Sequence, residues 1–408
     1  MQEIRIQPFR NYLIRAKWIF PVISSPIFDG AVEIKGGRIT RVDKFKILKK
    51  EKTHAEFLDL EEIILLPCLV NVHTHLELSA LRFKILPSSN FFIWVKSVIE
   101  KKQKLKPEEI RRYAYLSLVE LWYDGVGIIG DVENNSIISD LLLQSPFYGY
   151  IFKEILDFKG TYKLREIKNL NTNSKFKITY SAHAPYTVAP LLLQAIKSYN
   201  KKRKRIFTIH CAESPEEVEF LITGEGPIAE LLKERGQWNK SFVPPKLTPV
   251  KYLDKLNLLD KDTLLIHVIH VSEEDLNILK RTNVKICVCP RSNIYTGVGI
   301  PHIDKFYQVG IDVCLGTDSL ASNETLSIWE EMKIISSFYP SIPLNELLKM
   351  ATYNGAKALQ FNDLGAIAPG YKVNFIGVEI IGYLSDDAEV VLEKLINQKK
   401  EIKYRIYG

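Results

Sequence analysis

The sequence lacks any uninterrupted apolar run that approaches the roughly 18 to 20 residues needed to cross a bilayer. Arg and Lys interrupt the apolar residues of segment 1–20, which is therefore unlike a secretory signal. It also lacks low-complexity segments and repeats of fixed period. With 46% hydrophobic and 25% charged residues, the composition excludes a disordered or collagen-like chain. We expect a cytoplasmic protein with no membrane partner.

Cysteine is scarce, and its count of five in 408 residues is odd, which excludes a disulfide scaffold. Cys287 and Cys289 alternate with Val288, so both would face one side of a strand. A structural metal clip needs a second pair with ligand spacing, and the sequence has none. We expect reduced core thiols, because each cysteine lies in or beside an apolar, strand-like run: Cys68, Cys211, Cys287, Cys289 and Cys314.

The chain has only a weak excess of positive charge, since its formal net charge of +7 comes from 55 basic and 48 acidic residues. The densest basic run, KKRKR at 201–205, has a pattern that can bind nucleic acid. It directly precedes an apolar strand-like segment and has few aromatic residues beside it, so we interpret it as a solvated helix end. We expect no nucleic-acid partner; RNA or an anionic surface is the alternative.

Short apolar segments alternate with longer amphipathic stretches, which is typical of parallel βα units. Stretch 107–123, for example, starts with a Pro that suits a first helical position and has apolar residues at helical spacing. Eight such units in about 300 residues predict an α/β fold, a (β/α)8 TIM barrel, with its chemistry at the carboxyl ends of the strands. The predicted strands are 63–72, 127–131, 148–156, 176–181, 206–210, 263–268, 284–289 and 311–316.

The two ends of the chain have a different pattern from the rest. Residues 1–58 show short, alternating β-like segments with a turn at Lys35-Gly36-Gly37-Arg38, and residues 365–408 resume this pattern. We expect 1–58 and 365–408 to pair into one small composite β-sandwich domain. Residues 59–364 would then form the (β/α)8 barrel domain.

Six of the eight histidines lie at or just past the ends of predicted barrel strands. Imidazole is the commonest protein ligand for a transition metal, and random placement would not bring six of them to one rim. We therefore expect a metal site at this end of the barrel. The six are His73, His75, His183, His210, His267 and His270.

Four of the rim residues have the types and positions of metal ligands. His73 and His75 follow the first strand, and the period of two sends both rings to the same side. The fifth strand adds His210, and the LGTDS segment after the eighth adds Asp318, whose alternative role is that of a helix N-cap. Three imidazoles and one carboxylate with an open position for water predict a catalytic metal site. Glu213, three residues after His210, can reach a water at that site.

The sixth strand ends His267-Val268-Ile269-His270, and a spacing of three means that the two rings do not share a face. We expect His267 to point into the barrel. The alternative for both residues is a structural role, as core histidines whose ring nitrogens are hydrogen-bonded within the protein.

Together these residues resemble the amidohydrolase superfamily, in particular its mononuclear deaminase branch. Six motifs occur in the family's order: LPCLVNVHTHLELS, SAHAPYTV, HCAESPEEVEF, LIHVIHVSEEDL, CPRSN and LGTDSLASN. The resemblance runs from residue 63 to about 359 and includes the closing GAIAPGYKVNF, where Asn374 replaces the usual aspartate. It implies a (β/α)8 barrel with a β-sandwich built from both ends of the chain.

The resemblance also implies roles by position. Zinc, or iron as the alternative, would be bound by a set of four ligands, and Glu213 would be the proton shuttle. His267 would orient the attacking water or polarise the tetrahedral centre, and His183 would contact the substrate. The third strand (IFKEIL) has no lysine that clearly takes the bridging role of the binuclear branches, so one metal ion is favoured. The four ligands would be His73, His75, His210 and Asp318.

Within the superfamily the closest resemblance is to deaminases that act on 6-aminodeoxyfutalosine, in the futalosine route to menaquinone. It rests on HTHLELS, the FFIWVKSVIE segment, HAPYTV and the stretch from GEGPIAELL to PPKLTPVKYL. Deaminases of S-adenosylhomocysteine and methylthioadenosine share most of these motifs and are the alternative. A ring-amide hydrolase or chlorohydrolase, and a non-catalytic nucleoside-binding barrel, are further alternatives; Glu213 argues for an aromatic amidine, whose ring must be protonated.

For the catalytic step we expect Glu213 to take a proton from water and deliver it to the ring nitrogen, Asp318 to help protonate the departing amine, and His267 to stabilise the new C–O centre. For a small-molecule substrate we expect contacts from residues around the rim. These candidates are Glu77 for ribose hydroxyls, Arg291 and Asn293 for a carboxylate or hydroxyl, and Trp94 over the base. The alternatives for these residues are surface or core-packing roles. Whether the protein forms a homodimer is left open.

Overall fold

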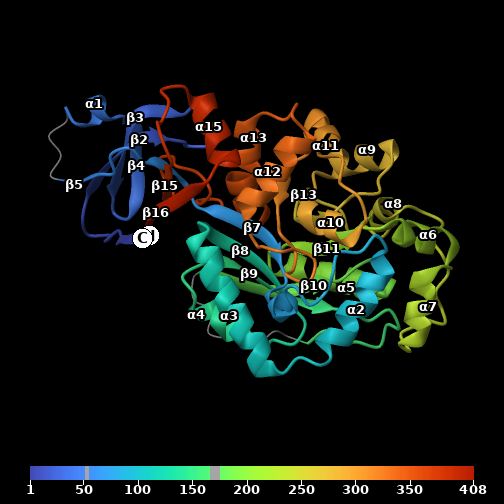
Figure 1. Ribbon diagram of the computed structural model, residues 1–408. Helices are drawn as coiled ribbons and strands as arrows, with labels where there is room; N and C mark the ends of the chain where they lie inside the picture. Colours follow the sequence, from blue (N-terminus) through green and yellow to red (C-terminus); the bar gives the residue numbers. More distant parts are fainter. Residues whose placement is uncertain (51–54, 166–174) are drawn as a thin grey trace. The chain divides into compact units, whose positions relative to one another are not determined.

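The computed structural model describes residues 1–50, 55–165 and 175–408 (Figure 1). These residues form two compact units, each of which draws on separate parts of the chain. The predicted domain boundaries near residues 58 and 365 stay a prediction. Unit 1 comprises Met1–Val70, Glu120–Ile128 and Ser327–Gly408, and unit 2 comprises Asn71–Val119 and Ile129–Leu326.

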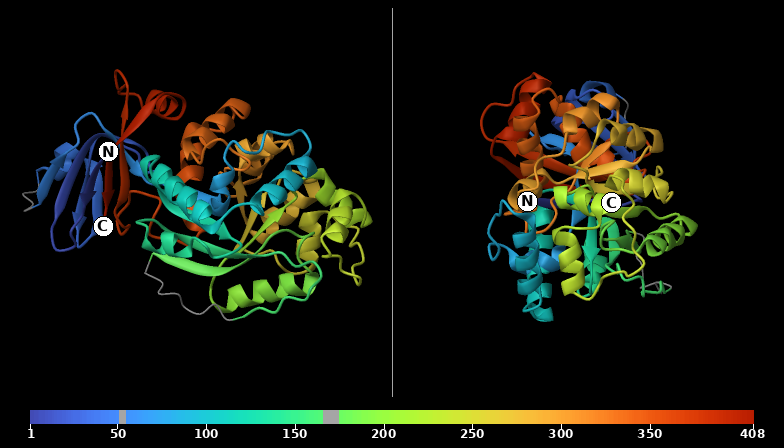
Figure 2. Two further views of the ribbon diagram at one scale, coloured as in Figure 1. Left: turned by 60° about the horizontal axis from the view of Figure 1, so that its bottom comes forward. Right: turned by 90° about the vertical axis from the view of Figure 1, so that its right-hand side faces the viewer.

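Unit 1 is built on one hydrogen-bonded sheet, with strand order β1-β16-β15-β6-β2-β3-β4 and β5 paired to β2. β1 runs parallel to β16, with Gln2 opposite Tyr404, so the two ends of the chain lie side by side, as Figure 2 shows in blue and red. This pairing joins the two ends of the chain in one sheet; the composite β-sandwich domain of 1–58 and 365–408 stays a prediction. The strands are β1 (Gln2–Arg5), β2 (Tyr12–Ile19), β3 (Ile27–Lys35), β4 (Arg38–Lys44), β5 (Glu56–Asp59), β6 (Ile64–Pro67), β15 (Asn374–Ile380) and β16 (Lys400–Tyr407).

The predicted turn joins β3 to β4 through Gly36 and Gly37, with Lys35 paired to Arg38. Both glycines have positive φ, at 59° and 75°, which a two-residue hairpin of the type I′ kind requires. Side chains on one face of the sheet form an apolar core that includes Ile14, Val32 and Phe375. Helices α1 (Phe45–Leu48), α12 (Ile328–Phe338), α13 (Leu344–Lys349), α14 (Gly355–Ala358) and α15 (Ala388–Asn397) belong to this unit, with a π-helical turn at Met350–Asn354.

The barrel strands form two four-stranded sheets, with orders β10-β9-β8-β7 and β11-β12-β13-β14. Every residue of β7, β8, β11 and β12 is buried, as expected for parallel strands covered on both faces. The strands are β7 (Leu69–Thr74), β8 (Val126–Glu133), β9 (Tyr148–Ile155), β10 (Phe176–Ala182), β11 (Phe207–Cys211), β12 (Thr263–His267), β13 (Lys285–Val288) and β14 (Val313–Leu315).

Backbone hydrogen bonds join the two sheets at both edges. At one edge the His210 amide donates to the carbonyl of His183 (2.9 Å), and at the other the Asp318 amide donates to the carbonyl of His73 (3.0 Å). A parallel bridge between Thr74 and Asp318 lies at the second edge. The eight strands therefore close in chain order into the predicted (β/α)8 barrel, and both closures lie at the carboxyl ends of strands, where the rim histidines are.

The first predicted strand, 63–72, is in fact two strands in different sheets, a correction to the sequence prediction. β6 pairs with β2 and β15 in the sheet of unit 1, whereas β7 pairs with β8 in the barrel. Pro67, at the end of β6, has no amide hydrogen to donate, which limits how far one ladder can continue. The other seven predicted strands are present with boundaries shifted by a few residues.

Prolines begin several of the barrel helices: α3, α5, α6, α7, α8 and α10 each have Pro as the first residue, where its missing amide hydrogen costs nothing. Within the described residues, no helix combines the length and apolar character that a membrane crossing requires. The helices are α2 (Phe91–Lys102), α3 (Pro107–Tyr123), α4 (Ser139–Gln144), α5 (Pro190–Lys202), α6 (Pro215–Thr223), α7 (Pro227–Glu234), α8 (Pro249–Lys255), α9 (Glu273–Thr282), α10 (Pro290–Thr296) and α11 (Ile303–Val309), with a 3-10 helix at Leu76–Leu81.

Candidate active site

The four predicted ligands, His73, His75, His210 and Asp318, converge at the carboxyl ends of the barrel strands. The Nε2 atom of His73 lies 3.1 Å from Nε2 of His75 and 3.2 Å from Nε2 of His210. The Oδ1 atom of Asp318 lies 3.8 Å from Nε2 of His73 and 3.6 Å from Nε2 of His75. Donor atoms from strands far apart in the sequence thus gather around Nε2 of His73: it shares one group able to hold a metal ion with His75 and Asp318, and another with His210 and His267.

These separations fit a single bound metal ion. For metal–ligand bonds of about 2.0–2.2 Å, tetrahedral geometry places neighbouring ligand atoms about 3.3–3.6 Å apart. The four distances range from 3.1 to 3.8 Å. Burial lowers the pKa of His73 well below its ordinary value, and the neighbouring imidazoles lower it further. The ring is therefore neutral, which is the form that binds a metal. The described residues thus contain a possible His/Asp metal site.

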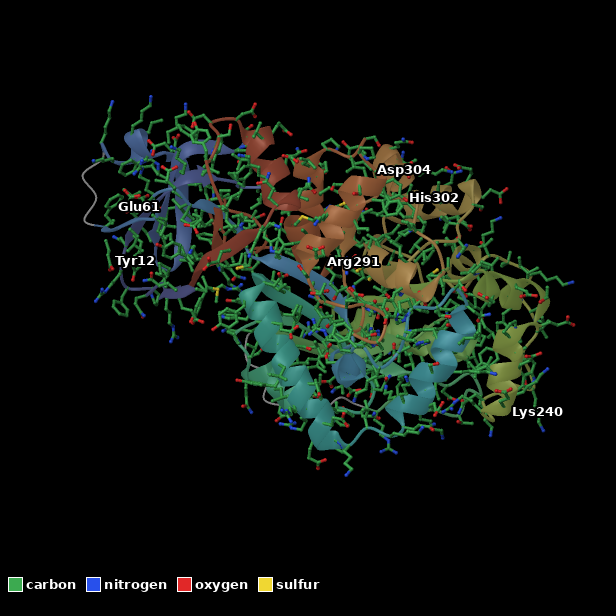
Figure 3. The ribbon with its side chains drawn as sticks, viewed as in Figure 1. Tyr12, Glu61, Lys240, Arg291, His302 and Asp304 are labelled. Carbon is green, nitrogen blue, oxygen red and sulfur yellow. The ribbon has the colours of Figure 1, made fainter. Side chains whose placement is uncertain are left out.

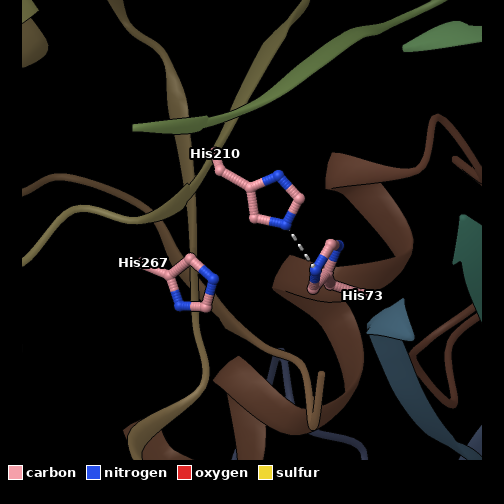
Figure 4. Close-up of side chains that lie close together, drawn as sticks. All are labelled: His73, His210 and His267. Atoms are coloured by element: carbon pink, nitrogen blue, oxygen red, sulfur yellow. Dashed lines mark hydrogen bonds between the residues drawn. The ribbon is translucent and has the colours of Figure 1, made fainter. Parts of the chain in front are cut away.

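Two of these ligands are oriented by hydrogen bonds on the side away from the cluster. Nδ1 of His210 lies 2.7 Å from the carbonyl oxygen of His183, which turns Nε2 towards His73 (Figure 4). Oδ2 of Asp318 accepts hydrogen bonds from the hydroxyls of Ser292 (2.7 Å) and Ser322 (2.9 Å), which leaves Oδ1 facing the imidazoles. Asp318 is therefore held by Ser292 of helix α10 and by Ser322 in the loop that follows β14.

Glu213 and His267 form a second pair beside this cluster. Oε1 of Glu213 lies 3.4 Å from Nε2 of His267, and both side chains are buried. Burial raises the pKa of Glu213 well above its ordinary value, and the negative charges of Asp318 and Glu217 raise it further. Burial lowers the pKa of His267 to about 3. At neutral pH, Glu213 is therefore the group of the pair that binds a proton readily.

Of the two histidines after the sixth barrel strand, His267 faces the site. Its ring centroid lies 5.4 Å from that of His210, in a stacked arrangement. Nδ1 of His267 lies 2.8 Å from the side-chain amide of Asn293, whose side chain is fully buried. His270 instead directs Nε2 to the carbonyl oxygen of Val298, at 2.9 Å. Asn293, predicted to bind substrate, is therefore in contact with His267.

Three other predicted substrate residues lie at different distances from the cluster. The ring of His183 is 5.0 Å from that of His210, and its Nδ1 lies 2.9 Å from the Thr187 hydroxyl. Nε of Arg291, labelled in Figure 3 near α10, donates to Oδ1 of Asn323 at 3.2 Å. The indole of Trp94 donates to the carbonyl of Ala321 at 2.9 Å and packs against Leu78, Leu81 and Ile85. Of these three, only His183 is brought to the cluster; the substrate roles stay predictions.

Glu77 is buried, and both of its carboxylate oxygens already have backbone donors. Oε2 accepts from the amide of Asn134 (3.1 Å) and Oε1 from the amide of Asn135 (3.2 Å), in the loop after β8. The glutamate therefore stabilises this loop. Its contact with ribose hydroxyls stays a prediction.

The sequence reasoning missed Glu154, which ends up beside the imidazoles. Glu154, His75 and His210 form one of the clusters able to hold a metal ion. Its neighbour Lys153 turns the opposite way and pairs with Glu133, because successive residues of a strand face opposite sides. The alternation within β9 was the signal that could have found Glu154. Burial raises the pKa of Glu154, but the imidazoles of His183, His75 and His210 lower it below its ordinary value.

Comparison with known proteins identifies the class. The amidohydrolase family matches residues 64–401, which is most of the chain. The chain therefore belongs to the amidohydrolase family, as its motifs predicted. It is a hydrolase that acts on carbon–nitrogen bonds.

Particular relatives have narrower names. The chain is 28% identical over 353 residues to an aminodeoxyfutalosine deaminase of Deinococcus radiodurans, covering 81% of each chain. It is also 28% identical over 375 residues to a 5-methylthioadenosine/S-adenosylhomocysteine deaminase of Thermoanaerobacter pseudethanolicus, covering 83% of this chain and 82% of the relative. Its fold is that of Helicobacter pylori aminofutalosine deaminase, solved with methylthio-coformycin: the TM-score is 0.86 and the identity 23%, over 97% of this chain and 98% of that one.

Proposed function

We propose that this protein is a metal-dependent deaminase that replaces the amino group of a purine nucleoside with oxygen from water and releases ammonia. The proposed substrate is 6-aminodeoxyfutalosine, on the route to menaquinone. The observation that carries the proposal is the convergence of His73, His75, His210 and Asp318 beside the Glu213–His267 pair. The similarity to the Deinococcus radiodurans deaminase supports the choice of substrate.

The proposed metal is zinc, bound by three imidazoles and one carboxylate, a donor set that zinc accepts. A divalent ion held there would supply the nucleophile, because such an ion lowers the pKa of water to about 7. The converging imidazoles and the fixed carboxylate of Asp318 already face one another, so binding of the ion requires no large rearrangement of these side chains. The four proposed ligands are His73, His75, His210 and Asp318.

Glu213 is the proposed proton shuttle. Its raised pKa allows it to accept a proton from the attacking water and pass it to the purine ring nitrogen next to the reacting carbon. Protonation of that nitrogen makes the amidine carbon electrophilic.

His267 and Asp318 are the proposed partners on the other side of the reacting carbon. His267 presents Nε2 towards Glu213, and Asn293 fixes its ring from behind, so the imidazole can stabilise the developing C–O centre. Asp318 would help to protonate the departing amine. The hydroxyls of Ser292 and Ser322 keep its second oxygen in place throughout.

A second candidate substrate class is 5-methylthioadenosine and S-adenosylhomocysteine, favoured by relatives of that name at the same identity of 28%. The experiment that decides is ammonia release by the zinc-loaded protein from 6-aminodeoxyfutalosine, methylthioadenosine, S-adenosylhomocysteine, adenosine, guanine and cytosine. We expect the highest kcat/KM with 6-aminodeoxyfutalosine. Preference for methylthioadenosine or S-adenosylhomocysteine would support the second candidate, and no ammonia from any compound would contradict both.

A further inference from the structure

Glu154, at the end of β9, has a buried carboxylate that is only half satisfied. Its side chain is 3% exposed, and Oε2 accepts a hydrogen bond from the side-chain amide of Asn134 at 2.7 Å. Within residues 1–50, 55–165 and 175–408, no donor is within hydrogen-bonding distance of Oε1. A carboxylate offers about four acceptor positions, so Oε1 can still accept a hydrogen bond. A donor from a ligand can therefore bind at Oε1.

The orientation of this carboxylate is fixed by a chain of hydrogen bonds from α2. The ammonium of Lys102 donates to Oδ1 of Asn134 at 2.6 Å, and the amide of Asn134 donates to Glu154. Lysine can only donate and a carboxylate can only accept, so the Asn134 amide has one possible orientation. Oε2 is thereby committed to Asn134, and Oε1 remains directed towards the imidazoles.

Glu154 lies with His75 and His210 in a cluster able to hold a metal ion, but both ring nitrogens of His210 and Nε2 of His75 already face other groups. Nδ1 of His210, 3.9 Å from Oε1 of Glu154, faces the carbonyl of His183 at 2.7 Å. The Nε2 atoms of His75 and His210 face His73. A second cation would have to take ligands from the first, so a hydrogen-bond donor is the better match for Oε1.

The position of Glu154 in the barrel indicates which part of a substrate it meets. Glu213, His267 and Asp318 follow strands β11, β12 and β14, in one four-stranded sheet, whereas Glu154 belongs to the other sheet. In this proposal, the purine places its reacting carbon near Glu213 and extends its sugar towards the sheet that carries Glu154. The uncharged donors there are the hydroxyl groups of the sugar.

We infer that Glu154 binds a sugar hydroxyl of the nucleoside through Oε1. This inference rests on the proposed function and deepens it, because it adds a ribose-recognition subsite. It also gives Glu154 the role expected of Glu77, whose two oxygens are occupied by backbone amides.

The test compares binding of two deamination products, inosine and 2′,3′-dideoxyinosine, by isothermal titration calorimetry with the zinc-loaded protein. Neither is turned over, so binding is read independently of ammonia release. A hydrogen bond to a charged acceptor predicts that the wild type binds inosine about 10- to 100-fold more tightly than the dideoxy compound. In Glu154→Gln this ratio should fall several-fold, through weaker inosine binding alone. Glu225→Gln, at an exposed position, is the matched control and should keep the wild-type ratio.

Three outcomes would overturn the assignment. The first is a wild-type ratio near one, or no binding of either nucleoside. The second is an equal loss of affinity for both compounds in Glu154→Gln, which would indicate a general structural role. The third is loss of zinc from Glu154→Gln by elemental analysis, which would make Glu154 a metal ligand. Failure of the proposed function is seen separately, as absence of ammonia from the substrate panel.

Discussion

Oε1 of Glu213 lies 3.4 Å from Nε2 of His267, although the two residues follow different barrel strands. Both strands end in left-handed backbone: φ is 53° at Ala212, 72° at His267 and 51° at Val268. Such φ values are uncommon and costly for residues other than glycine. The amide of Val268 donates to Cys211 and that of Ile269 to Ala212, so the two turns hold each other in this conformation. Backbone strain and packing thus set the distance between the two side chains.

Replacing Glu213 with Gln should leave metal binding intact and lower turnover by roughly 100- to 10,000-fold, because the amide cannot carry a proton between water and the purine. Ammonia release and elemental analysis of the same preparation measure both quantities. Glu219→Gln, at an exposed position on α6, is the control and should behave as wild type. Turnover of Glu213→Gln near that of the control would remove Glu213 from the mechanism.

Replacing His73 or His210 with Ala should abolish metal binding and activity together, since each contributes one of four converging donor atoms. Metal content by elemental analysis and ammonia release should fall in parallel. His302, labelled in Figure 3, is exposed and belongs to none of the clusters able to hold a metal ion, so His302→Asn should retain both. A His73 variant that keeps a full equivalent of metal would contradict the ligand assignment.

Replacing Asn293 with Ala should lower kcat by about 10- to 100-fold, because the ring of His267 loses the amide that fixes it. KM and metal content should stay near wild-type values, since Asn293 contacts neither substrate nor metal in this account. Steady-state kinetics gives the two parameters separately, with exposed Asn345→Ala as control. A rise in KM with unchanged kcat would instead favour the direct substrate contact predicted from the sequence.

Asp124, in unit 1, should make stability depend on pH. Burial raises its pKa from 3.8 to about 7, while Oδ1 accepts a hydrogen bond from Ser327 at 3.2 Å. Between about pH 4 and 7 the folded state keeps a proton that the unfolded state has released, so the free energy of unfolding falls as pH rises, by up to about 1.4 kcal/mol per pH unit.

The variant Asp124→Asn cannot titrate and should show a flatter dependence over this window, with a higher melting temperature than wild type near pH 7.5. Thermal denaturation from pH 4.5 to 7.5 measures this. Asp386→Asn, at an exposed position, should follow the wild type. Parallel curves for Asp124→Asn and wild type would contradict the raised pKa.

The sequence was sufficient to predict the barrel and the convergence of its ligands, because both follow from local patterns. Alternating apolar segments give the strands, and the carboxyl ends of parallel strands meet at one rim, so His73 and Asp318 could be expected together despite their separation. The split of segment 63–72 into β6 and β7 could not be predicted, because an apolar run does not reveal which sheet its halves join.

The partners of the remaining polar residues were also beyond sequence reasoning. Glu77 and Asn293 are polar and near the rim, which is typical of substrate contacts, but tertiary packing places a backbone loop against the first and His267 against the second. Glu154 was overlooked because nothing in the chemistry of a glutamate shows which face of the strand it takes. Only its alternation with Lys153 along β9 places its side chain beside the imidazoles. Side chains from several strands together determine which carboxylate oxygen lacks a hydrogen-bond donor, and a sequence does not show these neighbours.

The central claim is that three imidazoles and Asp318 hold one metal ion. Crystals of the zinc-loaded protein, measured at the zinc absorption edge, test it directly through the anomalous difference map. We predict one peak, within about 2.0–2.2 Å of Nε2 of His73, His75 and His210 and of a carboxylate oxygen of Asp318. A peak elsewhere, or none at this position in zinc-loaded crystals, would contradict the account.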